Sequence, residues 1–217
     1  MQGIEITAEQ PDIDCTRVAA EGYMFAVSDC TIGVTEAATF ANQLAAIKSA
    51  GLIAGAMHTP QPDTNTGTLG AIAEALAFCG AITNAGGLGA SQIPPAIKLA
   101  AAVQASQADM ITWLTAWVTQ VEAALGTSPM VCTSGDLWRQ LTGSSAAFSR
   151  LPLVAVAPSL TESHAPTVDG WPSADLWCWS SVESTAAKGP RVAGERVRIS
   201  RYLGEDWADL ITPQIRL

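Results

Sequence analysis

The stretch Ile93-Pro94-Pro95-Ala96-Ile97-Lys98-Leu99-Ala100 is the segment around which the rest of the chain is organised. It predicts a short buried strand that follows a Pro-Pro breaker. Because side chains along a strand point alternately to its two faces, Lys98 and Ala100 are expected on the same face. One face of this strand therefore presents a cation followed by a methyl group.

Strand-like and helix-like segments alternate on both sides of this stretch, a pattern typical of a parallel sheet with crossover helices. We expect strands at residues 3–7, 22–29, 52–59, 93–100 and 129–134 and helices at 15–21, 37–50, 68–84, 107–125 and 136–141. Three more strands, at 151–157, 175–181 and 196–203, follow with little helix between them. This order predicts an α/β fold in which the sheet closes into an irregular barrel. No repeat or linker divides the chain, so residues 1–217 are expected to form a single domain.

The helix at residues 107–125 has the clearest pattern. Ser106 and Asp109 are typical of an N-terminal cap, and Gly126 is typical of a helix stop. Between them runs an apolar stripe at helical spacing: Met110, Leu114, Trp117, Val118, Val121 and Leu125. One side of this helix is therefore expected to be buried.

The composition excludes several classes of partner. The chain is 48% hydrophobic and 14% charged, with a formal net charge of −9, which argues against nucleic acid and anionic membranes as partners. Its five cysteines are widely spaced and predict neither a disulfide framework nor a metal site, and we expect no cofactor. The N-terminal residues lack a signal-peptide pattern and no apolar run reaches membrane-spanning length, so we expect synthesis in a cytoplasm.

Several segments, in order, resemble one enzyme family. Residues 3–7 (Gly-Ile-Glu-Ile-Thr) are similar to its opening Gly-Ile-Asp-Val-Ser, residues 55–58 (Gly-Ala-Met-His) to its Gly-Ala-Tyr-His, and residues 94–100 to its Pro-x-x-Leu-Asp-x-Glu. The family is glycoside hydrolase family 25, the Chalaropsis-type lysozymes or muramidases. The resemblance covers nearly the whole chain and implies the family's irregular, TIM-like (β/α)5β3 barrel, with its site at the carboxyl ends of the strands.

The resemblance also shows where the chain departs from the family's catalytic pattern. Family acids come from the first, fourth and eighth strands, where this chain has Glu5, then Lys98 and Ala100, then Arg198. Cys30 stands at the family's Glu position on the second strand. Glycoside hydrolysis needs a protonated carboxylic acid and a second carboxylate. The resemblance therefore implies a degenerate site in which the general-acid position carries only a methyl group.

The substitutions at the former catalytic positions form a consistent set. Buried cations need nearby anions. We therefore expect Lys98 and Arg198 to pair with Glu5, and secondarily with Asp29, in a network that fills the former catalytic centre.

Four further residues are candidates for the surrounding groove. His58 is expected at a strand end facing the groove, or as a hydrogen-bonded structural residue. Trp177 and Trp179 are two apart and should share a strand face, either stacking on sugars or packing in the core. Asp63 lies in a loop that could supply a carboxylate.

Three functions remain open from the sequence. The first is a catalytically inactive, lysozyme-like protein with a structural or wall-glycan-binding role, which the resemblance places in a bacteriophage virion, on a capsid or tail, with other virion proteins or bacterial peptidoglycan as partners. The second is an active muramidase with relocated acids, Glu5 and Asp29 or a loop carboxylate. The third is a hydrolase or binder of an unrelated ligand.

Overall fold

The computed structural model describes residues 1–158, 166–182, 189–212 and 214–216. The strands in this part of the chain are β1 (Gln2–Ile6), β2 (Phe25–Ile32), β3 (Thr35–Glu36), β4 (Ile53–Thr59), β5 (Ala96–Lys98), β6 (Met130–Thr133), β7 (Leu153–Val156), β8 (Leu176–Cys178) and β9 (Arg198–Tyr202). The helices are α1 (Cys15–Ala20), α2 (Phe40–Ser49), α3 (Gly67–Asn84), α4 (Gln107–Leu125), α5 (Gly135–Thr142) and α6 (Ala208–Ile211).

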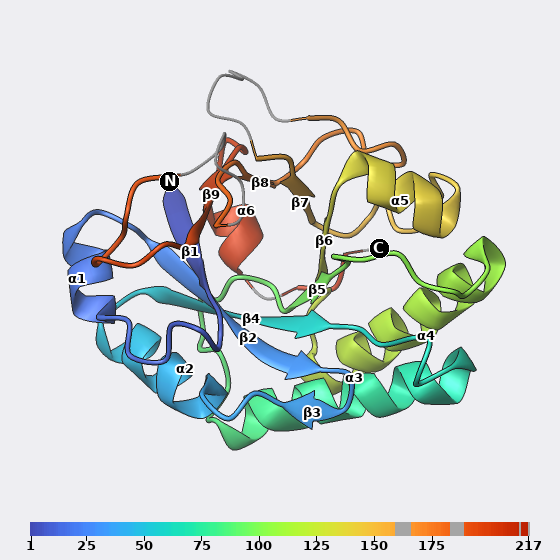
Figure 1. Ribbon diagram of the computed structural model, residues 1–217, viewed down its shortest axis with the longest axis horizontal. Coiled ribbons are helices and arrows are strands. Elements are labelled where there is room, and N and C mark those ends of the chain that lie inside the picture. Colours follow the sequence, from blue (N-terminus) through green and yellow to red (C-terminus); the bar gives the residue numbers. More distant parts are fainter. Residues whose placement is uncertain (159–165, 183–188, 213, 217) are drawn as a thin grey trace.

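The sheet closes into a barrel. Its strands follow the order β1-β9-β8-β7-β6-β5-β4-β2, and β1 pairs with β2 to complete the circle, while β3 is added outside β2 as a short antiparallel edge. The pairings are parallel from β1 through β2 and β4 to β8, whereas β9 is antiparallel to both of its neighbours. The predicted (β/α)5β3 order is therefore confirmed. Figure 1 shows α1 to α4 around the left, lower and right sides of the barrel, whereas β7, β8 and β9 lie at the top with α5 to their right.

Two apolar layers fill the fold because strand side chains alternate between the two faces of the barrel. The outer layer joins the strands to the helices and includes Ile4, Ala54, Ile97 and Ile199 with the buried stripe of α4. The inner layer fills the barrel itself with Phe25, Val27, Met57, Ala96, Met130, Cys132, Val154, Leu176 and Cys178. Polar strand residues of the inner face are thus brought together where this apolar filling ends.

Helix α4 has the bounds and caps that its sequence predicts. Ser106 Oγ accepts a hydrogen bond from the Asp109 backbone N–H at 3.2 Å, and Gly126 ends the helix in the left-handed region at φ 66°. Met110, Leu114 and Trp117 are buried as expected.

Three local features differ from expectation. Strand β5 is shorter than predicted, because Pro94 and Pro95 have no N–H for the ladder and the strand ends at Lys98. The edge strand β3 and the helix α6 were not expected. Trp207, just before α6, packs against Phe25 with ring centroids 5.5 Å apart and closes the end of the barrel where the parallel strands begin.

Candidate active site

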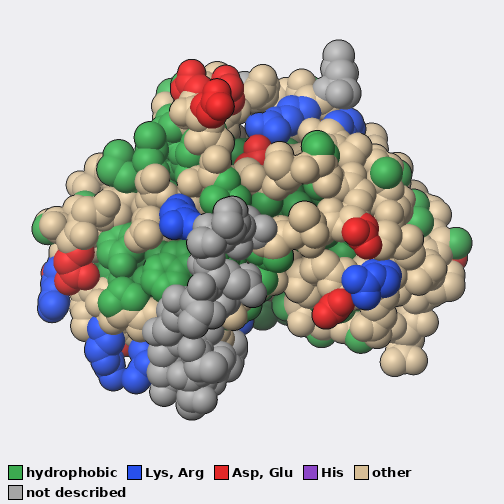
Figure 2. Space-filling model, turned by 90° about the horizontal axis from the view of Figure 1, so that it is seen from above, with side chains coloured by type: hydrophobic (Ala, Val, Ile, Leu, Met, Phe, Trp, Pro, Cys, Tyr) green, Lys and Arg blue, Asp and Glu red, His purple; other side chains and the backbone are tan. Residues whose placement is uncertain are grey.

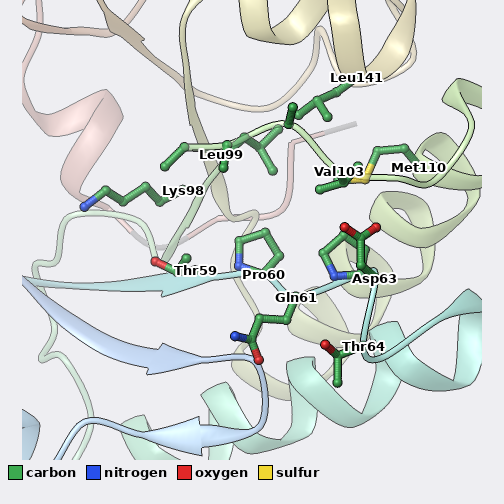
Figure 3. Close-up of a pocket in the computed structure, with 14 residues that line it drawn as sticks. Thr59, Pro60, Gln61, Asp63, Thr64, Lys98, Leu99, Val103, Met110 and Leu141 are labelled. Carbon is green, nitrogen blue, oxygen red and sulfur yellow. The ribbon is translucent and has the colours of Figure 1, made fainter.

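Three adjoining hollows open at the carboxyl ends of the parallel strands. One, of about 260 Å³, lies between the loop after β4 and residues 99–103. A second, of about 280 Å³, lies beside the loop after β1, and a third, of about 140 Å³, reaches the floor formed by Cys132 and Cys178. Lys98 lines all three, so its side chain stands where they meet. In Figure 3 it extends away from the end of the first hollow where Asp63 lies.

The charged residues of the mouth form one ion-pair cluster. Lys98 Nζ donates to Glu5 Oε1, and Arg198 Nη1 donates to the same oxygen at 3.2 Å. Lys98 Nζ also lies 3.9 Å from Asp29 Oδ1. Glu5 and Arg198 are directly paired residues of β1 and β9, which explains how the two ends of the sequence meet. The network expected from the sequence is therefore present, and it occupies the centre of the mouth.

Burial and charge act in opposite directions on these groups. Burial raises the pKa of Asp29 to about 6, against the lowering effect of the Lys98 ammonium. Burial alone would lower the pKa of Lys98, but the carboxylates of Glu5 and Asp29 outweigh it and raise that pKa above its ordinary value. Lys98 therefore stays charged, while Asp29 titrates near neutrality.

Asp29 is also poorly satisfied. Its Oδ1 is buried and accepts no hydrogen bond from any described residue, since 3.9 Å is too long for one from Lys98. Its side chain nevertheless remains 22% exposed and lines the hollow beside the loop after β1. Asp29 is thus the carboxyl group of the mouth that is held least tightly.

Ala100 lies just beyond the end of β5, exposed, and lines the same small hollow as Lys98 and Glu5. The two positions therefore share the mouth as expected, although the strand does not continue between them. A methyl group at this place can neither donate nor accept a proton.

Cys30 is not in the mouth. Its side chain is fully buried in the layer between barrel and helices, and burial raises the pKa of its thiol. The pairing of β2 with β4 shifts register between Asp29 and Thr31, and Asp29 is the residue of this strand that lines the mouth. The sequence position matched to the family's Glu therefore points away from the site.

His58 does not face the groove either. It is fully buried between Phe78 of α3 and Trp117 of α4, and its ring stacks on the indole at 5.3 Å. Nδ1 lies 2.8 Å from Thr31 Oγ1 and Nε2 lies 2.9 Å from Glu74 Oε2. Burial lowers the pKa of His58, although Glu74 acts in the opposite direction. It is the hydrogen-bonded structural residue of the two alternatives.

Glu74 is the partner that the sequence analysis missed. It is fully buried, and its carboxylate accepts from the Gln61 backbone N–H and, at 2.7 Å, from Asn65 Nδ2. Gln61 belongs to the loop that lines the first hollow of the mouth. The available signal was that Glu74 is the one charged residue among the eighteen of α3.

The two tryptophans do not line the three hollows of the mouth. Trp177 is 2% exposed, points to the outer side of the barrel next to Arg201, and donates from Nε1 to the Ala157 carbonyl. Trp179 lies beyond the end of β8 and packs partly buried on the outer layer. Both indole rings therefore pack in the core, and neither is placed to stack on a sugar in the mouth.

Asp63 lines the first hollow, but its Oδ1 accepts backbone hydrogen bonds from Gln104 and Ala105 at 2.8 and 3.3 Å. It therefore joins two loops. Among the described residues, no group of three or more His, Cys, Asp or Glu side chains is placed to hold a metal ion. No helix in the described part of the chain is long and apolar enough to cross a membrane.

Comparison with known proteins matches this barrel and its sequence to one family. The sequence profile of glycosyl hydrolases family 25 matches residues 4–187. This chain belongs to family 25. The resemblance drawn from the sequence is thereby confirmed over residues 4–187.

Its family 25 relatives include two with described activity. An N,O-diacetylmuramidase of Arthroderma benhamiae is 29% identical over 193 residues, which cover 82% of this chain and 75% of the relative. An N,O-diacetylmuramidase of Chalaropsis sp is 26% identical over 189 residues, covering 82% and 86%. The crystal structure of the bacterial lysozyme from Streptomyces coelicolor superposes with a TM-score of 0.80 at 22% identity, covering 97% of this chain and 94% of the lysozyme.

Proposed function

We propose that this family 25 chain binds bacterial wall glycan at its barrel mouth without cleaving it, and serves as a structural or docking component of a bacteriophage virion. The observation that carries the proposal is the pairing of Lys98 with Glu5 beside Ala100. A cation and a methyl group occupy the positions where hydrolysis needs an acid.

The chemistry of the mouth supports the proposed absence of cleavage. A general acid must deliver a proton to the departing oxygen, and losing it costs about 10²- to 10⁴-fold in rate. Glu5 accepts from both Lys98 and Arg198 and is therefore engaged in two ion pairs. The general acid is therefore absent at Ala100, and the Glu5 carboxylate is already occupied by its two cationic partners.

The binding part of the proposal rests on the family and on the groove. Family 25 relatives are named for muramidase activity, and the hollows beside Lys98 retain polar groups from Thr59, Gln61 and Gln10. The virion role rests on the family resemblance alone. If that role is right, mass spectrometry should detect the chain in phage particles purified from the source.

The decisive experiment measures binding and cleavage on the same purified peptidoglycan sacculi. The wild-type chain should sediment with the sacculi and release no reducing ends or muropeptides. A variant with Ala100→Glu and Lys98→Asp restores the family's two acids, and any activity it gains would show that the barrel still positions glycan. Release of muropeptides by the wild type would overturn the inactive assignment.

A second candidate function is favoured by one observation. Asp29 has a pKa of about 6, lines the mouth and lies next to Glu5 in the same cluster, as expected of a relocated general acid. In that case the wild type would release muropeptides and Asp29→Asn would abolish the release. Asp136→Asn is the matched control, because that carboxylate is on the surface with a side chain 93% exposed.

A further inference from the structure

The outer side of α3 is unusually apolar for a surface helix. Leu69 is 81% exposed and Leu76 is 53% exposed. The turn from β2 to β3 contacts this helix and adds Ile32 and Val34, which are 51% and 52% exposed. These four residues, which we call the α3 face, account for most of the large hydrophobic side chains exposed in the described part of the chain.

Exposed charge is sparse in the same region, where Glu36 of β3 is the exposed acid beside Val34. Among the eighteen residues of α3, all of them described, Glu74 is the one charged side chain, and it is fully buried. Neighbouring α4 has none between Asp109 and Glu122. By contrast, on the side of the molecule seen in Figure 2, acidic and basic side chains are scattered in small groups over the surface.

The exposed hydroxyl groups of α4 already donate hydrogen bonds within the helix. Thr112, Thr115 and Thr119 are exposed, and each hydroxyl donates to the carbonyl four residues earlier in the same helix. Because these donors are already satisfied, covering the helix would leave no hydroxyl proton without an acceptor. The surface of the two helices can therefore become an interface at low desolvation cost.

We propose that the α3 face is the contact through which two copies of this chain form a symmetric dimer. Two copies carry a formal charge of −9 each and repel one another, so they associate most readily through a surface that carries few charges, as the α3 helix does. A two-fold contact also places the same patch against itself, which an apolar patch tolerates and a patch of one charge sign does not. A helix of eighteen residues is about 27 Å long, so α3 offers an elongated contact surface to a second copy.

The test is the mass of the full chain in solution by sedimentation velocity, from low micromolar to several hundred micromolar protein. The weight-average mass should rise from 22.5 kDa toward twice that value. Added salt should strengthen the dimer, because it screens the repulsion between two acidic copies and breaks no ion pair in the contact. Leu76→Glu and Leu69→Glu should each weaken association by roughly tenfold or more.

Met24→Glu and Ile215→Glu are the matched controls, since they add the same charge at residues 46% and 42% exposed outside the α3 face. Thermal unfolding of all four variants establishes that each is folded. A wild-type chain that stays monomeric throughout overturns the proposal, as does a dimer weakened equally by the controls. A monomer whose α3 face binds a different protein would also overturn it.

Discussion

At the scale of single residues, Lys98 balances the negative charge of the carboxylates around it. It lies against Glu5 and 3.9 Å from Asp29, and its side chain is only 13% exposed. Arg198 also bonds Glu5, whereas Lys98 is the nearest cation recorded for Asp29. Removing Lys98 would therefore leave Asp29 as the less compensated of the two acids.

We expect Lys98→Met to lower the free energy of unfolding at pH 7.5 by about 2 kcal/mol, because a partly buried carboxylate loses its counter-charge. The double variant Lys98→Met with Asp29→Asn should recover most of this loss, since Glu5 keeps Arg198. Urea unfolding of the wild type, both single variants and the double variant measures the coupling. Strictly additive effects would contradict the cluster.

Asp29 should also make stability depend on pH. Its pKa is about 6 in the folded chain against an ordinary 3.8, so between these values the folded state holds a proton that the unfolded state has released. The wild type should therefore lose about 2 kcal/mol relative to Asp29→Asn as pH rises from about 4.5 to 7.5. Urea unfolding at both pH values checks this difference. Asp136→Asn, at an exposed carboxylate, should show none.

At the scale of elements, a buried acid on α3 positions the loop after β4. Glu74 accepts from the Gln61 backbone and from Asn65, whose carbonyl in turn accepts from Trp113 Nε1 of α4 at 2.8 Å. The loop that lines the first hollow of the mouth is thus tied to two helices behind it. Its shape depends on residues that do not line the hollow.

Replacing Glu74 with Gln should loosen this loop. An amide group presents N–H to donors that need an acceptor, so at least one buried donor is left unpaired at a cost of about 2 kcal/mol. Hydrogen exchange should become faster at Gln61, with β6 and β7 unchanged. Glu36→Gln, at an exposed acid on β3, is the control. Unchanged exchange at Gln61 in Glu74→Gln would contradict the role of Glu74.

At the scale of the whole molecule, the two ends of the barrel differ in the residues that fill them. The mouth holds the charged cluster, whereas the opposite end is closed by Trp207 and α6. Trp207 is 9% exposed and contacts Phe25 and Tyr202, with ring centroids 5.5 and 4.9 Å away. Stability and the proposed glycan binding should therefore be separable by changes at opposite ends.

Trp207→Ala should lower the free energy of unfolding by about 3 kcal/mol, because it opens a cavity in the inner layer of the barrel. Trp207→Phe should cost clearly less, since it keeps an aromatic ring against Phe25. Urea unfolding measures both, and sedimentation with sacculi should be equal for all three proteins under conditions where they are folded. Loss of sacculus binding in folded Trp207→Ala would contradict the separation of the two ends.

The sequence by itself determined the order of the barrel and the identity of the charged cluster. Turn residues, caps and apolar periodicity are local signals, so β5, α4 and their neighbours could be placed without coordinates. The pairing of Arg198 with Glu5 followed from charge balance on two strands that the family order makes neighbours, and that of Lys98 with Glu5 from charge balance across the same barrel mouth.

Only the tertiary structure decided which way several side chains point. A register shift near Asp29 brings that residue into the mouth and leaves Cys30 behind the barrel. The packing of α3 and α4 captures His58, and the pleat of β8 turns Trp177 outward. For Asp29, Cys30 and His58 the direction depends on an irregularity or a partner far away in sequence, about which a single strand's alternation carries no information; for Trp177, alternation leaves open which of the two strand faces is the outer one.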